Sequence, residues 1–302
     1  MDFSAEYVEC PIVAYENCLG METVLRSGTT YIKPGTADIR LGLYIDDRMK
    51  TTIAYNEVRK LNQIFKENGV NINISVAFVK KVDIKSYYEV DNVKLAYDLE
   101  EWYNFDPFYE KAWLVDKHEA DLVHVLLDSS QDWDVCGVGW TWRNTGMTAG
   151  FTACYDSDDI AMLDPDQETS TEYIFAHEIG HQLGLAHSRV DGGSPTFEVG
   201  FGEYADGNPN SGLGTIMTYA KERKPYFSSE YLRINSARYG DENNNAVAAL
   251  NAAGMSISLN YELNGPYNFP VFEEEPPEVA PKWEGFEKFL PLVQTQRGRG
   301  TQ

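Results

Sequence analysis

The chain has 302 residues, 43% of them hydrophobic and 13% aromatic, which is enough to bury one sizeable core or two modest lobes. Its formal net charge of −22 argues against nucleic acid and anionic membrane surfaces as partners. The sequence has no apolar run of about 18 residues, so no membrane-spanning helix is expected.

The first half of the chain carries strand and helix patterns in alternation. Residues 1–36 show no clear periodicity and are expected to form an irregular N-terminal segment. The apolar run at 121–127 (DLVHVLL) predicts a buried parallel strand, and His124 inside it is expected to be a hydrogen-bonded core residue. The other expected elements are a strand at 39–45, a helix at 49–67 closed by Gly69, a strand at 74–82, one or two helices within 92–119, and strands at 135–142 and 151–155.

One run, from His177 to His187 (HEIGHQLGLAH), holds three of the five histidines of the chain. His177 and His181 are four residues apart, so on a helix they lie on one face and can share a metal ion. Gly184 can adopt the left-handed conformation that ends a helix. The chain would then reverse, so that His187 approaches the same ion from another direction.

Glu178 stands beside the first of these histidines. From that position its carboxylate can reach a metal-bound water without becoming a ligand itself. Three neutral imidazoles leave the fourth position of a zinc ion open for water, which is typical of catalytic rather than structural sites. The run therefore predicts a zinc site that carries its own general base.

With this run the sequence resembles the metzincin metalloproteases, whose long motif is HExxHxxGxxH followed by a methionine turn. The segment 214–220 (GTIMTYA) matches such a turn. The resemblance implies that Met217 lies beneath the three histidines as an apolar support. In the astacin-like and serralysin-like branches, a tyrosine at the offset of Tyr219 can bind the zinc and stabilise the oxyanion. The alternative for Tyr219 is an ordinary packed tyrosine.

The branch within the metzincins is less sharply indicated than the clan. Ser188 follows the third histidine, as in matrixin-like enzymes, yet Met217 lacks the Tyr and Pro that directly follow it in those enzymes. The segment 136–140 (CGVGW) looks most like bacterial reprolysin-like (adamalysin-like) secreted peptidases. The resemblance covers about residues 37 to 262.

The resemblance also implies the fold and the place where substrates bind. A metzincin-type catalytic domain is α/β (α+β), with a twisted, mostly parallel sheet, an antiparallel edge strand, an active-site helix and a smaller irregular lower lobe. Extended peptides add to the edge strand through main-chain hydrogen bonds. Here that strand contains Gly137, Val138, Gly139 and Trp140. The glycines would let a substrate backbone approach closely, and Trp140 would either wall a pocket or pack in the core.

The cysteines and one acidic segment suggest further features. We favour disulfides between Cys10 and Cys18 and between Cys136 and Cys154, with free buried thiols as the alternative. The carboxylates of residues 156–168 could hold Ca²⁺, although a solvated acidic loop is the favoured interpretation. These carboxylates belong to Asp156, Asp158, Asp159, Asp164, Asp166 and Glu168.

Three parts are expected: an N-terminal segment at 1–36, the catalytic domain at 37–262 that the resemblance implies, and a tail at 263–302 whose composition is rich in Pro and Glu. Within the catalytic domain the upper lobe is expected to end at about residue 187. The N-terminus lacks the basic and apolar regions of a secretory signal, and we expect a secreted, extracellular protein whose signal is absent from this chain.

The resemblance implies a zinc metalloendopeptidase that hydrolyses internal peptide bonds of proteins, with one catalytic zinc ion and Glu178 activating the water. We expect the protein to act as a monomer on protein or peptide substrates.

Two rival interpretations remain open. In a gluzincin-type site, Glu198 or Glu203 would replace His187 as the third ligand, but Gly184 and Met217 argue against it. The other rival is a zinc-bearing binding or toxin module without turnover. A degenerate enzyme of that kind would be expected to have lost its base, and the base is present.

Overall fold

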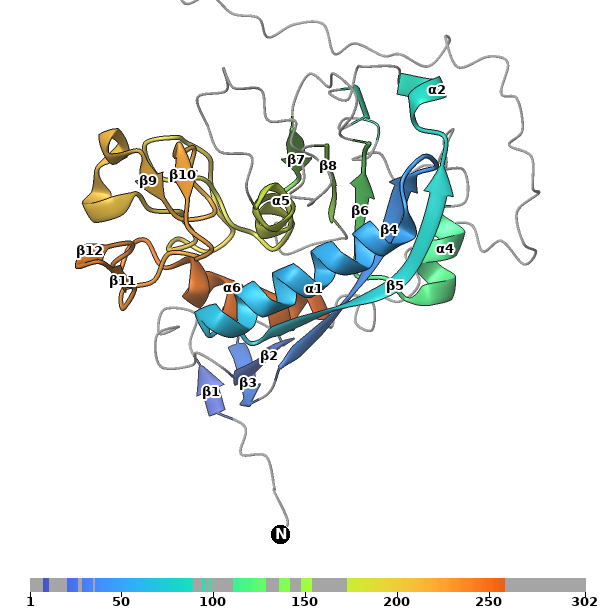
Figure 1. Cartoon of the computed structure of the whole chain (residues 1–302). Helices are drawn as coiled ribbons and strands as arrows, with labels where there is room; N and C mark the ends of the chain where they lie inside the picture. The colour runs from blue at the N-terminus through green and yellow to red at the C-terminus, as the bar shows by residue number, and fades with distance from the viewer. Residues whose placement is uncertain are drawn as a thin grey trace, which may run out of the picture.

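The computed structural model describes residues 8–10, 21–26, 29–34, 36–88, 94–95, 98, 111–128, 136–141, 148–153 and 173–258. A five-stranded sheet with the strand order β5-β4-β6-β8-β7 forms the centre of the molecule (Figure 1). All neighbouring strands are parallel except β7, which pairs antiparallel with β8 at one edge. The strands are β4 (Ala37–Asp46), β5 (Ile72–Val82), β6 (Leu122–Leu126), β7 (Gly137–Gly139) and β8 (Thr148–Thr152). The expected α/β fold with an antiparallel edge strand is confirmed.

Helices cover both faces of this sheet. Three of them, α1 (Thr51–Asn68), α5 (Ile174–Gln182) and α6 (Ala246–Ser258), share one hydrophobic cluster with the sheet. On the other face, α4 (Lys111–His118) packs into a second cluster, and the short α2 (Lys85–Tyr88) follows β5. The period of two along each strand divides β6 between the clusters.

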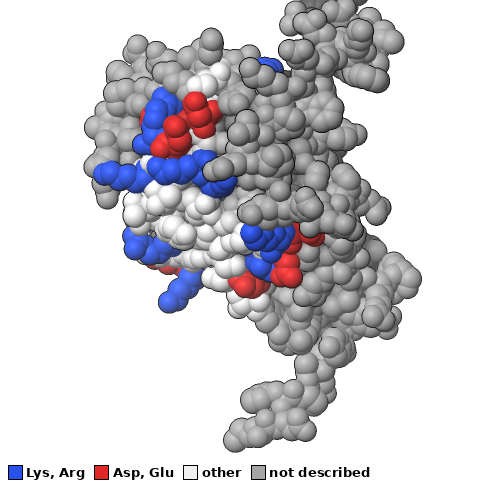
Figure 2. Space-filling view, turned by 90° about the vertical axis from the view of Figure 1, so that its right-hand side faces the viewer, with Lys and Arg blue, Asp and Glu red and all other residues white. Residues whose placement is uncertain are grey.

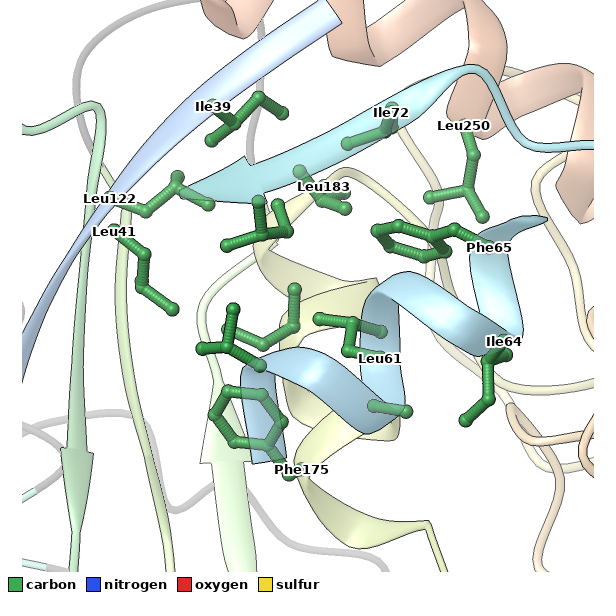
Figure 3. Packing of buried hydrophobic residues seen from close by; sticks show 14 of the residues in the cluster. Ile39, Leu41, Leu61, Ile64, Phe65, Ile72, Leu122, Phe175, Leu183 and Leu250 are labelled. Atoms are coloured by element: carbon green, nitrogen blue, oxygen red, sulfur yellow. The ribbon is translucent and has the colours of Figure 1, made fainter. Parts of the chain in front are cut away.

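The first cluster fixes the position of α5. Figure 3 shows Phe175 and Leu183 from the α5 region packed among side chains of α1 and the sheet, including Leu61 and Leu122. Every residue of α5 is buried, so the helix lies inside the molecule rather than on its surface. Figure 1 places it between β7 and β8 on one side and the short strands β9 and β10 on the other.

After α5 the chain has little regular structure. Its elements are η2 (Ala205–Gly207), η3 (Pro209–Ser211) and the short strands β9 (Leu213–Gly214), β10 (Glu222–Arg223), β11 (Arg233–Ile234) and β12 (Ala237–Arg238). This part matches the expected irregular lower lobe. The chain returns to the sheet through α6, which ends at Ser258.

The N-terminal segment differs from expectation. Residues 1–36 were predicted to be irregular, but they include an antiparallel sheet with the order β1-β3-β2. Its strands are β1 (Val8–Cys10), β2 (Met21–Arg26) and β3 (Thr29–Pro34). The two longer strands contain β-branched residues and flank a Ser-Gly pair in the sequence, which is a hairpin signal that the periodicity argument overlooked.

Several predictions fall on parts of the chain that the structure does not describe. The acidic segment 156–168, the tail at 263–302, Cys18 and Cys154 lie outside the described residues, so the calcium site and the disulfides stay predictions. None of the described helices combines the length and apolar character needed to cross a membrane. On one face of the molecule, described basic and acidic side chains lie beside one another (Figure 2). The described part of that face therefore has no broad region of a single charge.

A buried polar chain joins α5 to the sheet and confirms His124 as a hydrogen-bonded core residue. Gln182 donates its Nε2 to the carbonyl of Val123 at 2.9 Å, so its Oε1 accepts from Nδ1 of His124 at 2.7 Å. Nε2 of His124 is then left to accept from Oγ1 of Thr152 at 2.8 Å. These bonds hold the last residue of α5 to β6 and β8 and keep the His124 ring neutral.

This buried ring predicts a loss of stability in mild acid. Burial lowers the pKa of His124 from 6.5 to about 4, so below pH 6.5 the unfolded chain binds a proton that the folded chain excludes. The free energy of unfolding should therefore fall by about 3 kcal/mol between pH 6.5 and pH 4 on account of this ring. Urea unfolding of the wild type and His124→Gln at pH 7.5 and 4.5 measures it. Equal acid losses in both proteins would contradict this assignment.

Candidate metal centre

Helix α5 carries the first two histidines of the motif. Their imidazole rings lie with centroids 4.8 Å apart and nearly perpendicular, at 85°. Both side chains are buried, with 2% of His177 and 8% of His181 exposed. The helix begins at Ile174 with Tyr173 as its N-cap at a φ of 63°. The i, i+4 spacing therefore places two imidazoles on one face, as predicted.

Gly184 reverses the chain and delivers the third imidazole. Its φ of 92° lies in the region that favours glycine. The N–H of Gly184 donates to the carbonyl of His181 at 2.8 Å, and the N–H of Leu185 donates to that of Gly180 at 2.9 Å. This pattern closes the helix in the manner of a Schellman motif. The following residues lead His187 back toward the helix.

The Nε2 atoms of the three imidazoles converge on one point. Nε2 of His187 lies 3.0 Å from Nε2 of His181 and 3.2 Å from Nε2 of His177. Two nitrogens about 2.05 Å from a tetrahedral zinc ion lie roughly 3.3 Å apart, so the spacing suits zinc. Among the described residues, these three side chains are the group that could hold a metal ion.

The outer nitrogen of each ring fixes its tautomer. Nδ1 of His177 donates to the carbonyl of Ile216 at 2.7 Å, and Nδ1 of His181 donates to that of Leu185 at 2.9 Å. A carbonyl only accepts, so the proton is on Nδ1 and the lone pair of Nε2 points to the shared centre. Burial lowers the pKa of His181 to about 4 and that of His187 to about 3. The rings are therefore neutral at physiological pH, as metal binding requires.

The structure offers no support for the gluzincin-type alternative, in which Glu198 or Glu203 replaces His187 as the third ligand. The Oε1 of Glu203 accepts from the N–H of Tyr204 at 3.0 Å, and its Oε2 accepts from Nδ2 of Asn244 at 2.7 Å. Glu198 is exposed, and neither carboxylate joins the cluster that contains His187.

Met217 lies directly under the histidine-bearing helix. It is fully buried in a tight turn, in which the N–H of Thr218 donates to the carbonyl of Thr215 at 3.1 Å. Its Sδ would lie 2.6 Å from a Cβ placed on Gly180, the residue before His181. Only a glycine at that position lets the thioether approach so closely, which agrees with the support role predicted for Met217.

Glu178 is buried beside the edge strand. A Cβ on Gly137 would come within 2.7 Å of its Oε1, so the strand and the carboxylate are in close contact. Burial raises the pKa of Glu178 to about 8, whereas the charge of Arg223 and the backbone N–H of Gly139 act to lower it. A cation held by the three imidazoles would lower it further. A carboxylate whose pKa lies near neutrality suits proton transfer.

The edge strand β7 shows why its glycines are needed. A Cβ on Gly139 would lie 2.3 Å from the carbonyl oxygen of Glu178, so the missing side chains of both glycines make room for α5. The side chains of Val138 and Trp140 pack against the second hydrophobic cluster. The predicted substrate contacts of this strand, which remain a prediction, would therefore come from its main chain.

Tyr219 lies beside the third histidine. Nδ1 of His187 lies 3.2 Å from the Tyr219 hydroxyl, and the two ring centroids are 4.3 Å apart. With the Nε2 of His187 turned to the metal centre, Nδ1 carries the proton and donates it to that hydroxyl. Burial raises the pKa of Tyr219, with Glu178 as the next cause. The hydroxyl contacts the outer nitrogen of the ligand ring, and its predicted zinc and oxyanion roles stay predictions.

Arg223 is a residue of the site that the sequence did not indicate. Only 4% of it is exposed, and its Nε donates to the carbonyl of Thr218 at 2.9 Å, directly before Tyr219. Burial lowers its pKa, and the charge of Glu178 is the first influence that raises it. No spacing rule marks it, because it stands in a charged stretch (KERK) where each residue could equally be solvated.

Comparisons with known proteins agree with this geometry. The family model for "Metallo-peptidase family M12B Reprolysin-like" matches residues 45–253. The Peptidyl-Asp metalloendopeptidase of Pseudomonas aeruginosa is 24% identical over 249 residues, which cover 74% of this chain and 38% of that protein.

Two solved structures are similar to this chain. The one described as "Structure of a chaperone-substrate complex" has a TM-score of 0.50 and 18% identity over 79% of this chain and 37% of that chain, a likeness of fold alone. Archaemetzincin from Methanopyrus kandleri has a TM-score of only 0.30 at 13% identity, over 63% of this chain and 89% of its own, and supports no argument. This chain thus spans less than two fifths of the Pseudomonas protein and of the first structure.

Proposed function

This chain belongs to the reprolysin-like metallopeptidase family M12B, and from that premise we propose that it is a zinc-dependent endopeptidase. The observation that carries the proposal is the convergence of three Nε2 atoms, at 3.0 and 3.2 Å, with the buried carboxylate of Glu178 one residue from the first of them. His177, His181 and His187 would hold the ion. Their neutral rings leave room for water as a further ligand.

Glu178 is the group that moves protons in the proposed reaction. A bound zinc ion would acidify water toward neutral pH and polarise the scissile carbonyl. Glu178 accepts a proton from the attacking water and returns it to the leaving amine. Burial raises the pKa of Glu178 and a cation held by the three imidazoles would lower it again, and the balance of the two suits a group that takes up and returns a proton near neutral pH. The hydroxyl of Tyr219, 3.2 Å from Nδ1 of His187, would turn from that ring to donate toward the developing oxyanion.

The substrate would extend along β7. This strand pairs with β8 on one side and is the last strand of the sheet within the described part of the chain, so an added peptide strand would pair with its other side. An extended peptide laid along an edge continues past the site in both directions. That arrangement suits cleavage within a chain rather than at its end.

A cleavage assay with a metal chelator distinguishes a zinc peptidase from a zinc-binding module that has no catalytic activity. We expect an unfolded protein substrate to be cleaved, cleavage to stop with 1,10-phenanthroline, and zinc to restore it. A protein that binds zinc and cleaves no substrate would support the binding module instead.

A preference for an acidic residue beside the scissile bond is the finer part of the proposal. The Pseudomonas relative is named a Peptidyl-Asp metalloendopeptidase, and Arg223 provides a buried cation whose charge acts on Glu178. Two peptides that differ only by Asp or Asn at that position measure it. We expect kcat/KM to be at least ~10-fold higher for Asp, since a charge-assisted hydrogen bond contributes about 1.5–3 kcal/mol. The ratio should fall toward 1 in Arg223→Met, and an equal rate for both peptides in the wild type would contradict it.

We also infer that the protein acts outside the cytoplasm with its cysteines paired. The even number of four cysteines supports this, because disulfides persist in oxidising compartments. Peptide mapping under non-reducing conditions should link Cys136 to Cys154 and Cys10 to Cys18. Four alkylated thiols in protein purified from the culture medium would contradict the pairing.

A further inference from the structure

A single carboxylate in the lower lobe gathers three hydrogen bonds directly behind the metal centre. Oδ2 of Asp191 accepts from Oγ of Ser188 at 2.7 Å. Both carboxylate oxygens of Asp191, at 2.9 and 2.8 Å, accept from the hydroxyl of Tyr204. The backbone N–H of Tyr219 also points to Oδ2, at 3.4 Å. We call Ser188, Asp191, Tyr204 and the Tyr219 backbone the Asp191 cluster.

Two of the segments that contribute to this cluster also complete the metal site. Ser188 directly follows the ligand His187 along the chain, and Tyr219 lies two residues after Met217. The hydroxyl of Tyr219 accepts in turn from Nδ1 of His187 at 3.2 Å. These links form a closed ring. Asp191 binds Ser188, Ser188 is joined to His187 by the chain, His187 binds the Tyr219 hydroxyl, and the Tyr219 backbone N–H binds Asp191. No other ligand histidine has such a ring among the described residues, since His177 and His181 bond to carbonyls.

The backbone turn after His187 determines where the Asp191 carboxylate points. The N–H groups of Asp191 and Gly192 both donate to the carbonyl of Ser188, at 3.0 and 3.1 Å, which turns the chain back on itself after His187. Gly192 at a φ of 93° and Gly193 at 102° continue the reversal in a region that favours glycine. A Cβ on Gly193 would meet Ala186 at 3.3 Å, so the turn packs against the strand-like segment that carries His187.

Two buried hydroxyl groups depend on the Asp191 carboxylate as their acceptor. Ser188 is 2% exposed and Tyr204 is 4% exposed, so their hydroxyls need an acceptor inside the protein. Burial and the contact with Asp191 raise the pKa of Tyr204, which keeps its proton in place as a donor. Arg223, which donates to the carbonyl of Thr218, adds a nearby positive charge that acts on the same cluster.

We propose that Asp191 is a positioning residue for the metal centre. Its carboxylate binds the chain next to His187 and next to Tyr219, and so holds these two side chains at a fixed separation. The other two ligands sit on a buried helix, whereas His187 lies outside any helix and follows Ala186, which forms a single β-bridge with Phe201. The carboxylate supports the chain on the other side of His187, at Ser188. This inference rests on the proposed function only in that the three imidazoles bind a metal ion.

The test compares zinc affinity and coordination in variants of the full chain. Zinc dissociation constants are measured by competition with a chromophoric chelator, and coordination is followed by the visible spectrum of the Co²⁺-substituted protein. Asp191→Ala should weaken zinc binding ~10- to 100-fold and change the cobalt bands, as loss of an outer hydrogen-bond partner does at other metal sites. Asp191→Asn keeps the acceptor oxygen and should recover most of the affinity.

Asp83→Ala is the matched control. Asp83 also accepts a serine hydroxyl and a backbone N–H, both from Ser86, but it lies at the end of β5 away from the histidines. It should leave zinc affinity and the cobalt spectrum unchanged. If Asp191→Ala does not fold, the double variant Ser188→Ala/Tyr204→Phe removes two donors to the carboxylate and should weaken zinc binding ~10-fold, the lower end of such effects.

The outcomes separate this inference from the proposed function. Wild-type zinc affinity and cobalt bands in Asp191→Ala, or in the double variant where the first does not fold, would overturn the positioning role while the peptidase assignment stands. An Asp83→Ala effect as large as that of Asp191→Ala would overturn it as well. A wild-type protein that binds no zinc would overturn both.

Discussion

Glu178→Gln is expected to bind zinc and fold as the wild type does, and to lower kcat/KM for peptide hydrolysis by ~10³-fold or more. The amide has the same shape as the carboxylate, but it cannot accept the proton of the attacking water, and general acid–base catalysis contributes ~10²–10⁴-fold. The burial that raises the pKa of Glu178 to about 8 is also why a neutral amide should fit there without strain. Steady-state cleavage of a quenched fluorescent peptide measures the effect.

The control for this variant is Glu203→Gln, which changes a partly buried carboxylate of the lower lobe that the structure places outside the metal cluster. It should keep kcat/KM within a few-fold of wild type. A Glu178→Gln protein with zinc bound and wild-type activity would remove Glu178 from the mechanism.

The second large effect is expected from His187→Ala, which should weaken zinc binding by a factor on the order of 10²–10³. Structural zinc sites derive about 10–16 kcal/mol of binding free energy from four ligands, so one ligand contributes a few kcal/mol. Zinc at 100 times the wild-type dissociation constant should stabilise the wild type by about 2.7 kcal/mol, which raises its Tm. In the variant this zinc-dependent rise in Tm should largely vanish. Differential scanning fluorimetry over a zinc titration reads both quantities.

His118→Ala provides the matched histidine control. His118 lies in α4, against Phe78 with ring centroids 5.7 Å apart, and takes no part in the metal cluster. Its substitution should lower Tm at most slightly and leave the zinc-dependent rise intact. If His187→Ala kept the full zinc-dependent rise in Tm, the third ligand would have to be another residue.

The metal ligands could be predicted from sequence because their geometry is local. The i, i+4 spacing of His177 and His181 fixes their relation on any helix, and Gly184 marks the reversal three residues later. Strands such as β4 and β6 were equally clear, since their dense apolar runs suit a sheet covered on both faces. In each case one short window of sequence contains all the information needed.

Features that depend on contacts between distant segments were missed. Asp191 and Arg223 act through burial and through partners in other loops, and neither property leaves a mark on spacing. The role of Gly139 was explained by substrate approach, whereas the structure shows that it gives space to the backbone of Glu178, 39 residues away in the chain. The N-terminal hairpin was overlooked because its alternation is weaker than that of a core strand.

The most direct test of the account is a crystal structure of the purified protein with diffraction recorded on both sides of the zinc absorption edge. We predict one anomalous peak per chain, about 2.0–2.1 Å from the Nε2 atoms of His177, His181 and His187, with a carboxylate oxygen of Glu178 beside it but not bound to it. A peak coordinated by other side chains, or the absence of any peak from protein that is active as a peptidase, would contradict it.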